Sequence, residues 1–176
     1  MAEIAKAPGV VFDLRGYPKA SPYWLGHLLS APDRATWSFV PHVIRPDYEG
    51  VTSFTEAGWN LMPLAPRISG AVAFITGPGA ASYAESVMGM VEGYRLGAIV
   101  GAPTAGVNGN VNTFEVPGGF TIFFTGMKVT RLDGRQHHLV GVQPTHPVSR
   151  TLAGIRAGRD EELEAALALV RPARRR

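Results

Sequence analysis

The 176-residue sequence contains no cysteine. This excludes disulfide bonds, thiol catalysis and cysteine–zinc sites as sources of structure or chemistry. The sequence also lacks any run of about 18 consecutive apolar residues, the length that a membrane-spanning helix needs. Its N-terminus, MAEIAKAPGVV, has no basic start, apolar middle and small-residue cleavage site. We therefore expect neither a membrane span nor a signal peptide.

Charged residues make up only 18% of the chain, and the formal net charge of +3 comes from one end. Arg171 and the arginines at 174–176 form a basic tail over residues 171–176. Without these four residues, thirteen basic side chains oppose fourteen acidic ones. A nucleic-acid partner would require a basic face on a folded element, so we expect no nucleic-acid binding. The tail is typical of a solvated terminus.

The composition is that of a globular protein, with 45% hydrophobic residues. Its 21 glycines and 14 prolines predict many turns and short elements. The length favours a single domain, which we expect to span residues 1–170.

Apolar runs predict three strands of a parallel sheet, the first at residues 9–14. The second and third lie in 70–79 and 97–106, and each of these segments ends in a glycine-rich turn. A helix over 82–96 joins the second strand to the third in a βαβ unit, and an amphipathic helix over 159–170 closes the chain. The weaker expectations are a helix end at 2–7, a short helix at 23–30, extended segments at 35–46, 60–64, 111–119 and 120–132, and irregular chain over the rest of 47–68.

Ser82 lies in the stretch TGPGAASYAESVMGMVEGY (76–94), at the predicted start of a helix. With Glu85 it forms the S-x-x-E pattern of a capping box, which needs no chemistry. A serine here can also be a nucleophile, because the N–H groups and dipole of a helix N-terminus favour the negative charge of an acyl-transfer oxyanion. The pattern differs from the G-x-S-x-G nucleophile elbow. On local grounds both interpretations stay open.

Four motifs follow one another along the chain: VVFDLRGYP, GAASYAESV, IVGAPTAGVNG, and DGRQHHLVGVQP followed by AGRDEELEAAL. In this order they resemble the C-terminal processing (tail-specific) serine proteases, closer to the branch of the tricorn-protease core. The resemblance covers about residues 9–170. It implies an α/β fold with a crotonase/Clp-protease-like core of repeated ββα units, and hydrolysis of peptide bonds through a serine acyl-enzyme.

Residue by residue, the resemblance implies that Ser82 is the nucleophile and that the N–H of Tyr83 is one oxyanion donor. A second donor would come from the loop after DLRG, near Lys19 or Ala20, although this loop lacks the paired glycines usual in the family. Asp13 and Arg15, at the end of the first strand, are interpreted as a scaffold for this loop.

The general base is not identified. In the Ser/Lys branch of the family it is a lysine one residue past T-x-G, a position held here by Val107, which cannot accept a proton. The tricorn-like branch uses a histidine from an N-terminal segment, oriented by a glutamate whose approximate place is taken here by His137 and His138. Thr145 replaces the family's usual aspartate. We therefore expect a catalytic-core fragment that lacks an N-terminal part, with His138 as a candidate base or orienting residue.

The other candidate sites are weaker. His137 and His138 also fit a loop pair of which one side chain faces inward and the other is solvated. Three histidines in HHLVGVQPTH have no carboxylate at ligand spacing, so we expect no metal. Lys128 is expected to be exposed on a strand. The segment TAGVNGN (104–110) lacks both the P-loop lysine and the G-x-G-x-x-G spacing, so we expect no nucleotide cofactor.

The sequence thus favours a serine peptidase core with a peptide or protein substrate and no cofactor, weak or inactive as an isolated chain. The alternative is a non-catalytic peptide-binding or assembly module of the same fold. An acyl-thioester enzyme on a crotonase scaffold is a third and less favoured hypothesis. Oligomer formation is left open. The resemblance also implies a periplasmic or secreted parent protein.

Overall fold

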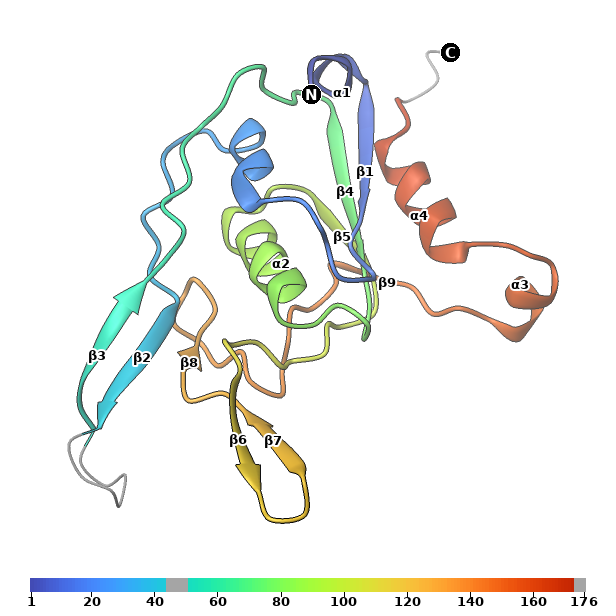
Figure 1. Ribbon diagram of the computed structural model, residues 1–176. Coiled ribbons are helices and arrows are strands. Elements are labelled where there is room, and N and C mark those ends of the chain that lie inside the picture. Colours follow the sequence, from blue (N-terminus) through green and yellow to red (C-terminus); the bar gives the residue numbers. More distant parts are fainter. Residues whose placement is uncertain (44–50, 173–176) are drawn as a thin grey trace.

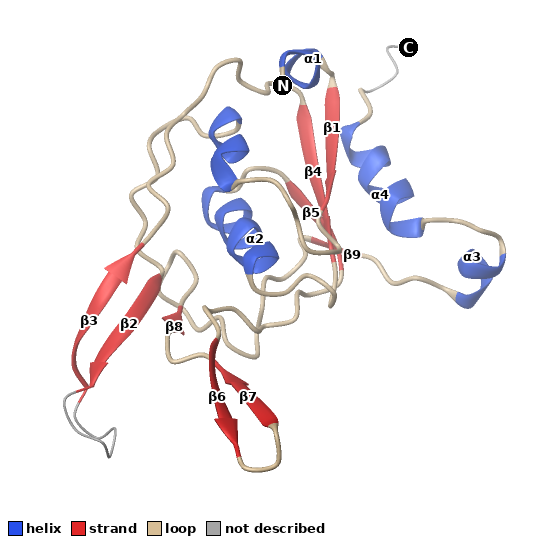
Figure 2. Cartoon of the chain, viewed as in Figure 1, coloured by secondary structure: helices blue, strands red, loops and turns tan. Residues whose placement is uncertain are grey.

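A four-stranded parallel sheet forms the centre of the molecule in the computed structural model, which describes residues 1–43 and 51–172 (Figures 1 and 2). Its strand order is β1-β4-β5-β9, and the strands are β1 (Gly9–Asp13), β4 (Ala71–Thr76), β5 (Ala98–Gly101) and β9 (His146–Pro147). The register pairs Phe12 with Phe74 and Phe74 with Ile99. The predicted parallel sheet is thereby confirmed in its three main strands.

Helices cover both faces of this sheet (Figure 1). Helix α2 (Tyr83–Tyr94) packs Val87, Met88 and Val91 into the same buried cluster as Phe74. On the other face, α4 (Glu161–Val170) contributes Ala166 and Val170 to a cluster with Ala73, Ile75 and Val100. Successive residues of β4 therefore point into two different cores. This explains why the strand reads as an unbroken apolar run rather than an alternating one.

Two antiparallel sheets lie to one side of this core (Figures 1 and 2). Strands β2 (Ser38–Val43), β3 (Val51–Ala57) and β8 (Lys128–Val129) form a three-stranded sheet in the order β3-β2-β8. Strands β6 (Asn112–Val116) and β7 (Phe120–Phe124) form a separate two-stranded hairpin that projects from the body. The remaining short elements are α1 (Ala2–Lys6), the 3₁₀ helix η1 (Pro22–His27) and α3 (Leu152–Arg156).

The structure differs from the sequence-based expectations mainly at the periphery. The predicted strand at 60–64 is a loop, in which Leu61 is buried and its carbonyl accepts a hydrogen bond from the N–H of Asp33. Pro63 has no N–H to donate, which opposes a strand there. The segment 47–68, expected to be irregular, contains β3 instead; residues 44–50 lie outside the described residues.

Two further short elements, α3 and β9, were not predicted, since each is too brief to show a period. The predicted 120–132 strand is divided into β7 and β8, with Gly126 between them. Of the basic tail, residues 173–176 lie outside the described part of the chain. No helix among the described residues has both the length and the apolar character needed to cross a membrane.

Candidate active site

Ser82 immediately precedes α2 and has a backbone conformation that glycine favours, with φ 52° and ψ −116°. A residue with a β-carbon in such a region costs about 1–3 kcal/mol, and the surrounding structure must hold it there. Two interactions do so: the N–H of Ser82 donates to the carbonyl oxygen of Val107 at 3.0 Å and to Oε2 of Glu85 at 3.3 Å. Strain of this kind is concentrated at functional sites.

The predicted capping box of Ser82 and Glu85 is present at the start of α2. Its Glu85 half is the hydrogen bond from the N–H of Ser82, whereas the Ser82 side chain makes no cap hydrogen bond. The half-buried serine instead lines a cavity beside the helix N-terminus. Ser82 therefore combines the capping position with a place in the cavity lining.

Tyr83 connects the start of α2 to the loop after DLRG. Its hydroxyl donates to the carbonyl oxygen of Ala20 at 2.7 Å, and its ring lies 5.9 Å from that of Tyr17. Burial and the nearby Tyr17 raise the pKa of Tyr83, so its hydroxyl keeps its proton at neutral pH. Within the described chain, the N–H of Tyr83 donates to no backbone carbonyl. That N–H is therefore available to an incoming acceptor at the positive end of the helix dipole.

The turn before Ser82 lies against the same loop. A β-carbon on Gly79 would stand 2.7 Å from the carbonyl oxygen of Arg15, so only glycine fits this approach. Lys19 is exposed in this loop, one residue before Ala20. The structure therefore brings together the two segments predicted to supply oxyanion donors.

Arg15 fixes the start of this loop to the opposite side of the sheet. Its guanidinium pairs with Asp13 at 2.6 Å, with Asp160 at 2.8 Å and with Glu162 at 2.8 Å. Hydrogen bonds from Arg15 lower the pKa of Asp13 and of Asp160, and the same contacts raise the pKa of Arg15. This network ties the end of β1 to the N-terminus of α4.

Glu85 is the hub that joins the motifs. Its fully buried carboxylate accepts hydrogen bonds from Thr104 Oγ1 at 2.6 Å, from the N–H of Gly106 at 2.7 Å and from the N–H of Val107 at 2.8 Å. Burial alone raises the pKa of Glu85, but the adjacent His137 and hydrogen bonds from Thr104 and Gly106 outweigh it and leave the pKa below the ordinary value. Glu85 is thus a carboxylate that orders the loop beside Ser82, and all its contacts are internal.

The structure separates the two adjacent histidines. His137 is buried, with Nε2 3.2 Å from Oε1 of Glu85, close enough for an ion pair but without hydrogen-bond geometry. His138 is exposed and lines a different cavity, with Lys128 and Gln136. The inward histidine is therefore His137, and it faces Glu85. His138 does not line the cavity next to Ser82.

The remaining departures from the family pattern have clear local surroundings. Val107 is half-exposed. Its N–H donates to Glu85 and its carbonyl accepts from the N–H of Ser82, so the residue at which the resemblance would place a lysine base is next to the serine. Thr145, at the position where the resembled family usually has an aspartate, binds the backbone of β5. Its hydroxyl accepts a hydrogen bond from the N–H of Ile99 at 2.9 Å and donates one to the carbonyl oxygen of Ile99 at 3.1 Å. Lys128 is exposed on β8, with Nζ 5.6 Å from the ring centre of Phe39.

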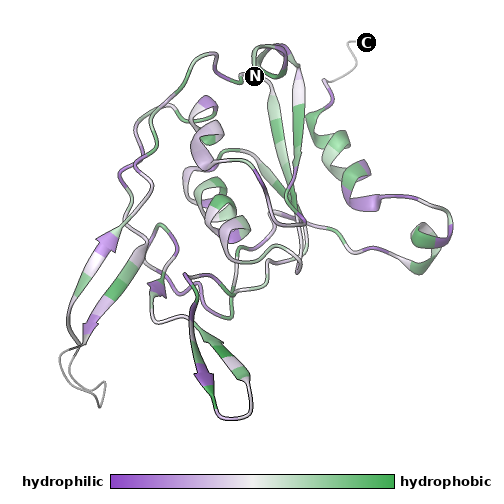
Figure 3. Cartoon of the chain, viewed as in Figure 1, coloured by the Kyte–Doolittle hydropathy of each residue, from purple (hydrophilic) through white to green (hydrophobic). Residues whose placement is uncertain are grey.

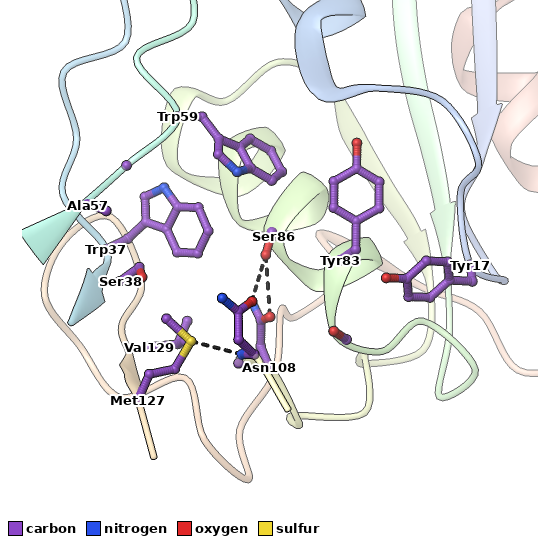
Figure 4. Close-up of a pocket in the computed structure, with 14 residues that line it drawn as sticks. Tyr17, Trp37, Ser38, Ala57, Trp59, Tyr83, Ser86, Asn108, Met127 and Val129 are labelled. Carbon is purple, nitrogen blue, oxygen red and sulfur yellow. Dashed lines mark hydrogen bonds between the residues drawn. The ribbon is translucent and has the colours of Figure 1, made fainter. Parts of the chain in front are cut away.

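The cavity beside Ser82 has a volume of about 340 Å³ (Figure 4). Four aromatic rings line it, and so do Ser86 and Asn108, whose side chains hydrogen-bond each other at 3.0 Å. None of these lining residues except Ser82 and Tyr83 was singled out from the sequence. Only Ser86 could have been predicted from the sequence to lie near Ser82, because it is four residues further along the helix and thus on the same face. The aromatic residues of the lining are Tyr17, Trp37, Trp59 and Tyr83.

Comparison with known proteins places this geometry in context. The sequence model described as "Peptidase family S41" matches residues 31–148. No curated protein matches the sequence.

Solved structures with the same fold include three relatives at low sequence identity. A candidate peptidase from Parabacteroides merdae has a TM-score of 0.77 and 20% identity, covering 97% of this chain and 54% of that one. Mature CPAF complexed with lactacystin has a TM-score of 0.71 and 17% identity, and the match covers 89% of this chain and 42% of that one. The photosystem II D1 C-terminal processing protease has a TM-score of 0.55 and 16% identity, and the match covers 95% of this chain and 40% of that one. The chain thus spans about half, or less, of the length of these proteins.

Proposed function

We propose, because this chain belongs to peptidase family S41, that it is a serine peptidase core that hydrolyses peptide bonds through an acyl-enzyme. Membership rests on the family match over residues 31–148, and the structures similar to it support the same class of enzyme. The finer part of the fold assignment, a crotonase/Clp-like core of repeated ββα units over residues 1–170, belongs to this proposal as well.

The observation that carries the proposal is the strained backbone of Ser82. A residue that only capped a helix would need no glycine-like conformation, because ordinary N-caps have extended backbones. Here the strained residue lines the cavity, and the N–H of Tyr83 that follows it has no backbone partner in the described chain.

In the proposed reaction, Ser82 Oγ attacks the carbonyl carbon of the scissile bond. The resulting oxyanion accepts hydrogen bonds from the N–H of Tyr83 and from the loop near Lys19. Collapse of this intermediate breaks the C–N bond, the amine leaves with a proton, and water then hydrolyses the ester. Preorganised donors of this kind are worth about 10²–10³ in rate for each one removed.

The proton of Ser82 must pass to a general base, and the cavity lining does not supply one. The only titratable side chains that line it, in the part of the chain that the structure describes, are Tyr17 and Tyr83. We therefore propose that the isolated chain has little or no peptidase activity, because an unactivated serine is a weak nucleophile. A peptide or protein is the proposed substrate.

A second candidate function, a non-catalytic peptide-binding or assembly module, is favoured by Val107 in place of the family's lysine. A small fluorophosphonate without a peptide portion distinguishes the two hypotheses. Its label is located by peptide mass mapping, with Ser82→Ala and Ser86→Ala as paired variants. The incubation is long and at pH 9, where hydroxide can take the proton that no side chain of the cavity accepts. Slow labelling that Ser82→Ala abolishes and Ser86→Ala preserves supports the peptidase; a Ser82 that stays unlabelled under these conditions supports the binding module.

A further inference from the structure

The cavity beside Ser82 has a continuous aromatic wall (Figure 4). The ring centres of Trp37 and Trp59 are 5.4 Å apart at an interplanar angle of 90°. Those of Trp59 and Tyr83 are 5.7 Å apart, and those of Tyr83 and Tyr17 are 5.9 Å apart. The wall therefore extends from the antiparallel sheet across the start of α2 to the loop after DLRG.

The polar groups of the cavity are all neutral. No acidic or basic side chain belongs to its lining among the described residues. Ser86 and Asn108 already satisfy each other through hydrogen bonds at 3.0 and 3.3 Å (Figure 4). A charged side chain that entered would lose water without gaining a partner, which is costly. The lining therefore disfavours lysine, arginine, aspartate and glutamate.

The two tryptophans form a corner that suits an aromatic guest. Because their rings are perpendicular, a third ring can meet the face of one and the edge of the other, the arrangements that aromatic pairs prefer. The volume of about 340 Å³ lies at the lower end of the range for ligand pockets, which fits one large side chain.

We propose that this cavity binds the side chain of the substrate residue whose carbonyl is attacked, and that it selects a neutral aromatic side chain. The selection is assigned to Trp59 and Trp37, with Ser86 limiting the depth. This inference rests on the proposed function, since attack by Ser82 defines which substrate residue enters the cavity.

Binding of product-like peptides tests the selection without requiring a reactive serine. N-acetyl-Ala-Ala-Phe, N-acetyl-Ala-Ala-Ala and N-acetyl-Ala-Ala-Lys are titrated calorimetrically into the full 176-residue chain. We expect the phenylalanine peptide to bind at least about ten-fold more tightly than the other two. Equal affinities, or a preference for lysine, overturn the inference.

Two variants locate the selection in the cavity. Trp59→Ala removes one ring of the corner, and Ser86→Leu fills the space below it; each is expected to reduce the ratio of phenylalanine to alanine affinity by about ten-fold. Phe123→Ala, exposed on β7 and outside the cavity lining, is the control and should keep the ratio. Circular dichroism shows whether each variant folds. If Trp59→Ala does not fold, the affinity ratio of Ser86→Leu decides whether the selection lies in the cavity. An unchanged ratio in a folded variant overturns the assignment.

Fluorophosphonate labelling of the same samples separates this inference from the proposed function. Selective binding without a label at Ser82 leaves the aromatic site in place as that of a binding module and rejects the peptidase. A label at Ser82 without selective binding keeps the peptidase and rejects the aromatic subsite.

Discussion

Ser82 is the N-cap of α2 and the proposed nucleophile, and its backbone conformation distinguishes it from an ordinary N-cap. A serine at φ 52° and ψ −116° is less stable than a glycine would be at the same position. We therefore expect Ser82→Gly to be more stable than Ser82→Ala by about 1–2 kcal/mol, measured as the free energy of unfolding in urea.

Gly89 supplies the opposite control within the same helix. It lies inside α2, and a β-carbon there meets no neighbour within 4 Å. Gly89→Ala should raise stability by about 1 kcal/mol, because alanine is the better helix former. If alanine is also preferred over glycine at position 82, Ser82 is not strained and the principal support for its role is lost.

Glu85 is the residue whose loss should most disturb the site. In Glu85→Gln an amide group must face at least one of the N–H groups of Gly106 and Val107, which leaves buried donors unpaired. We expect a loss of about 3 kcal/mol in the free energy of unfolding. Glu115→Gln, exposed and bonded to Thr121 at 2.6 Å, should change it by less than about 0.5 kcal/mol. A small effect at Glu85 would contradict its role as the hub.

The lowered pKa of Glu85 also predicts a pH dependence. Its unfolded pKa is close to the ordinary value of 4.5 and its folded pKa is lower, so the folded state favours the charged form. The contribution of Glu85 to the free energy of unfolding is fully present above pH 4.5 and is lost as the pH falls through the folded pKa of Glu85. Wild type should therefore lose more stability than Glu85→Gln between about pH 5 and pH 3. Parallel curves in that range would refute the assignment, since Asp13 and Asp160 titrate in both proteins.

At the scale of elements, the hairpin β6–β7 packs little against the rest of the fold, since every residue of its two strands except Val116 is exposed. Alternate residues of its two strands form one apolar face, and Figure 3 shows both strands with hydrophobic stretches. Phe120 on this face is 67% exposed. Phe120→Thr should thus change the free energy of unfolding by less than about 0.5 kcal/mol, whereas Phe74→Ala in the core should cost about 3–5 kcal/mol. A cost near that of Phe74→Ala would mean that the face is covered in solution.

The core elements could be predicted from the sequence because each has a long local signal. Strand β4 is an apolar run up to Thr76, and α2 is preceded by a serine N-cap with a glutamate three residues later. The edge strand β3, with the sequence VTSFTEA, gave no comparable signal. It forms because β2 pairs with it along its whole length, a contact that local patterning does not encode.

At the scale of the whole molecule, the site combines segments that local motifs cannot bring together. Ser82, Tyr83 and the loop near Lys19 were predicted from motif order, and they do lie close together. Trp37 and Trp59 enter the cavity from the segments that flank β2 and β3. Nothing near Ser82 in the sequence indicates them, because their position depends on how the antiparallel sheet packs beside α2.

Val107 provides a test of the missing base. Its side chain is half-exposed beside Ser82, so Val107→Lys should be tolerated and should introduce a base where the Ser/Lys branch has one. We expect the fluorophosphonate to label Ser82 at least about ten-fold faster in this variant at pH 8, since general-base catalysis typically contributes 10²–10⁴. Val111→Lys, on an exposed residue of the same region, controls for the added charge. Equal rates in the two variants would contradict this location for the base.

The central claim, that Ser82 is a nucleophile positioned next to the N–H of Tyr83, is tested most directly by a crystal structure of the chain with a peptide boronic acid ending in a phenylalanine analogue. The account predicts a bond from boron to Ser82 Oγ and a boronate oxygen about 2.7–3.1 Å from the N–H of Tyr83. A boron atom bound to Ser86, or a peptide bound in the cavity with Ser82 unmodified, would contradict it.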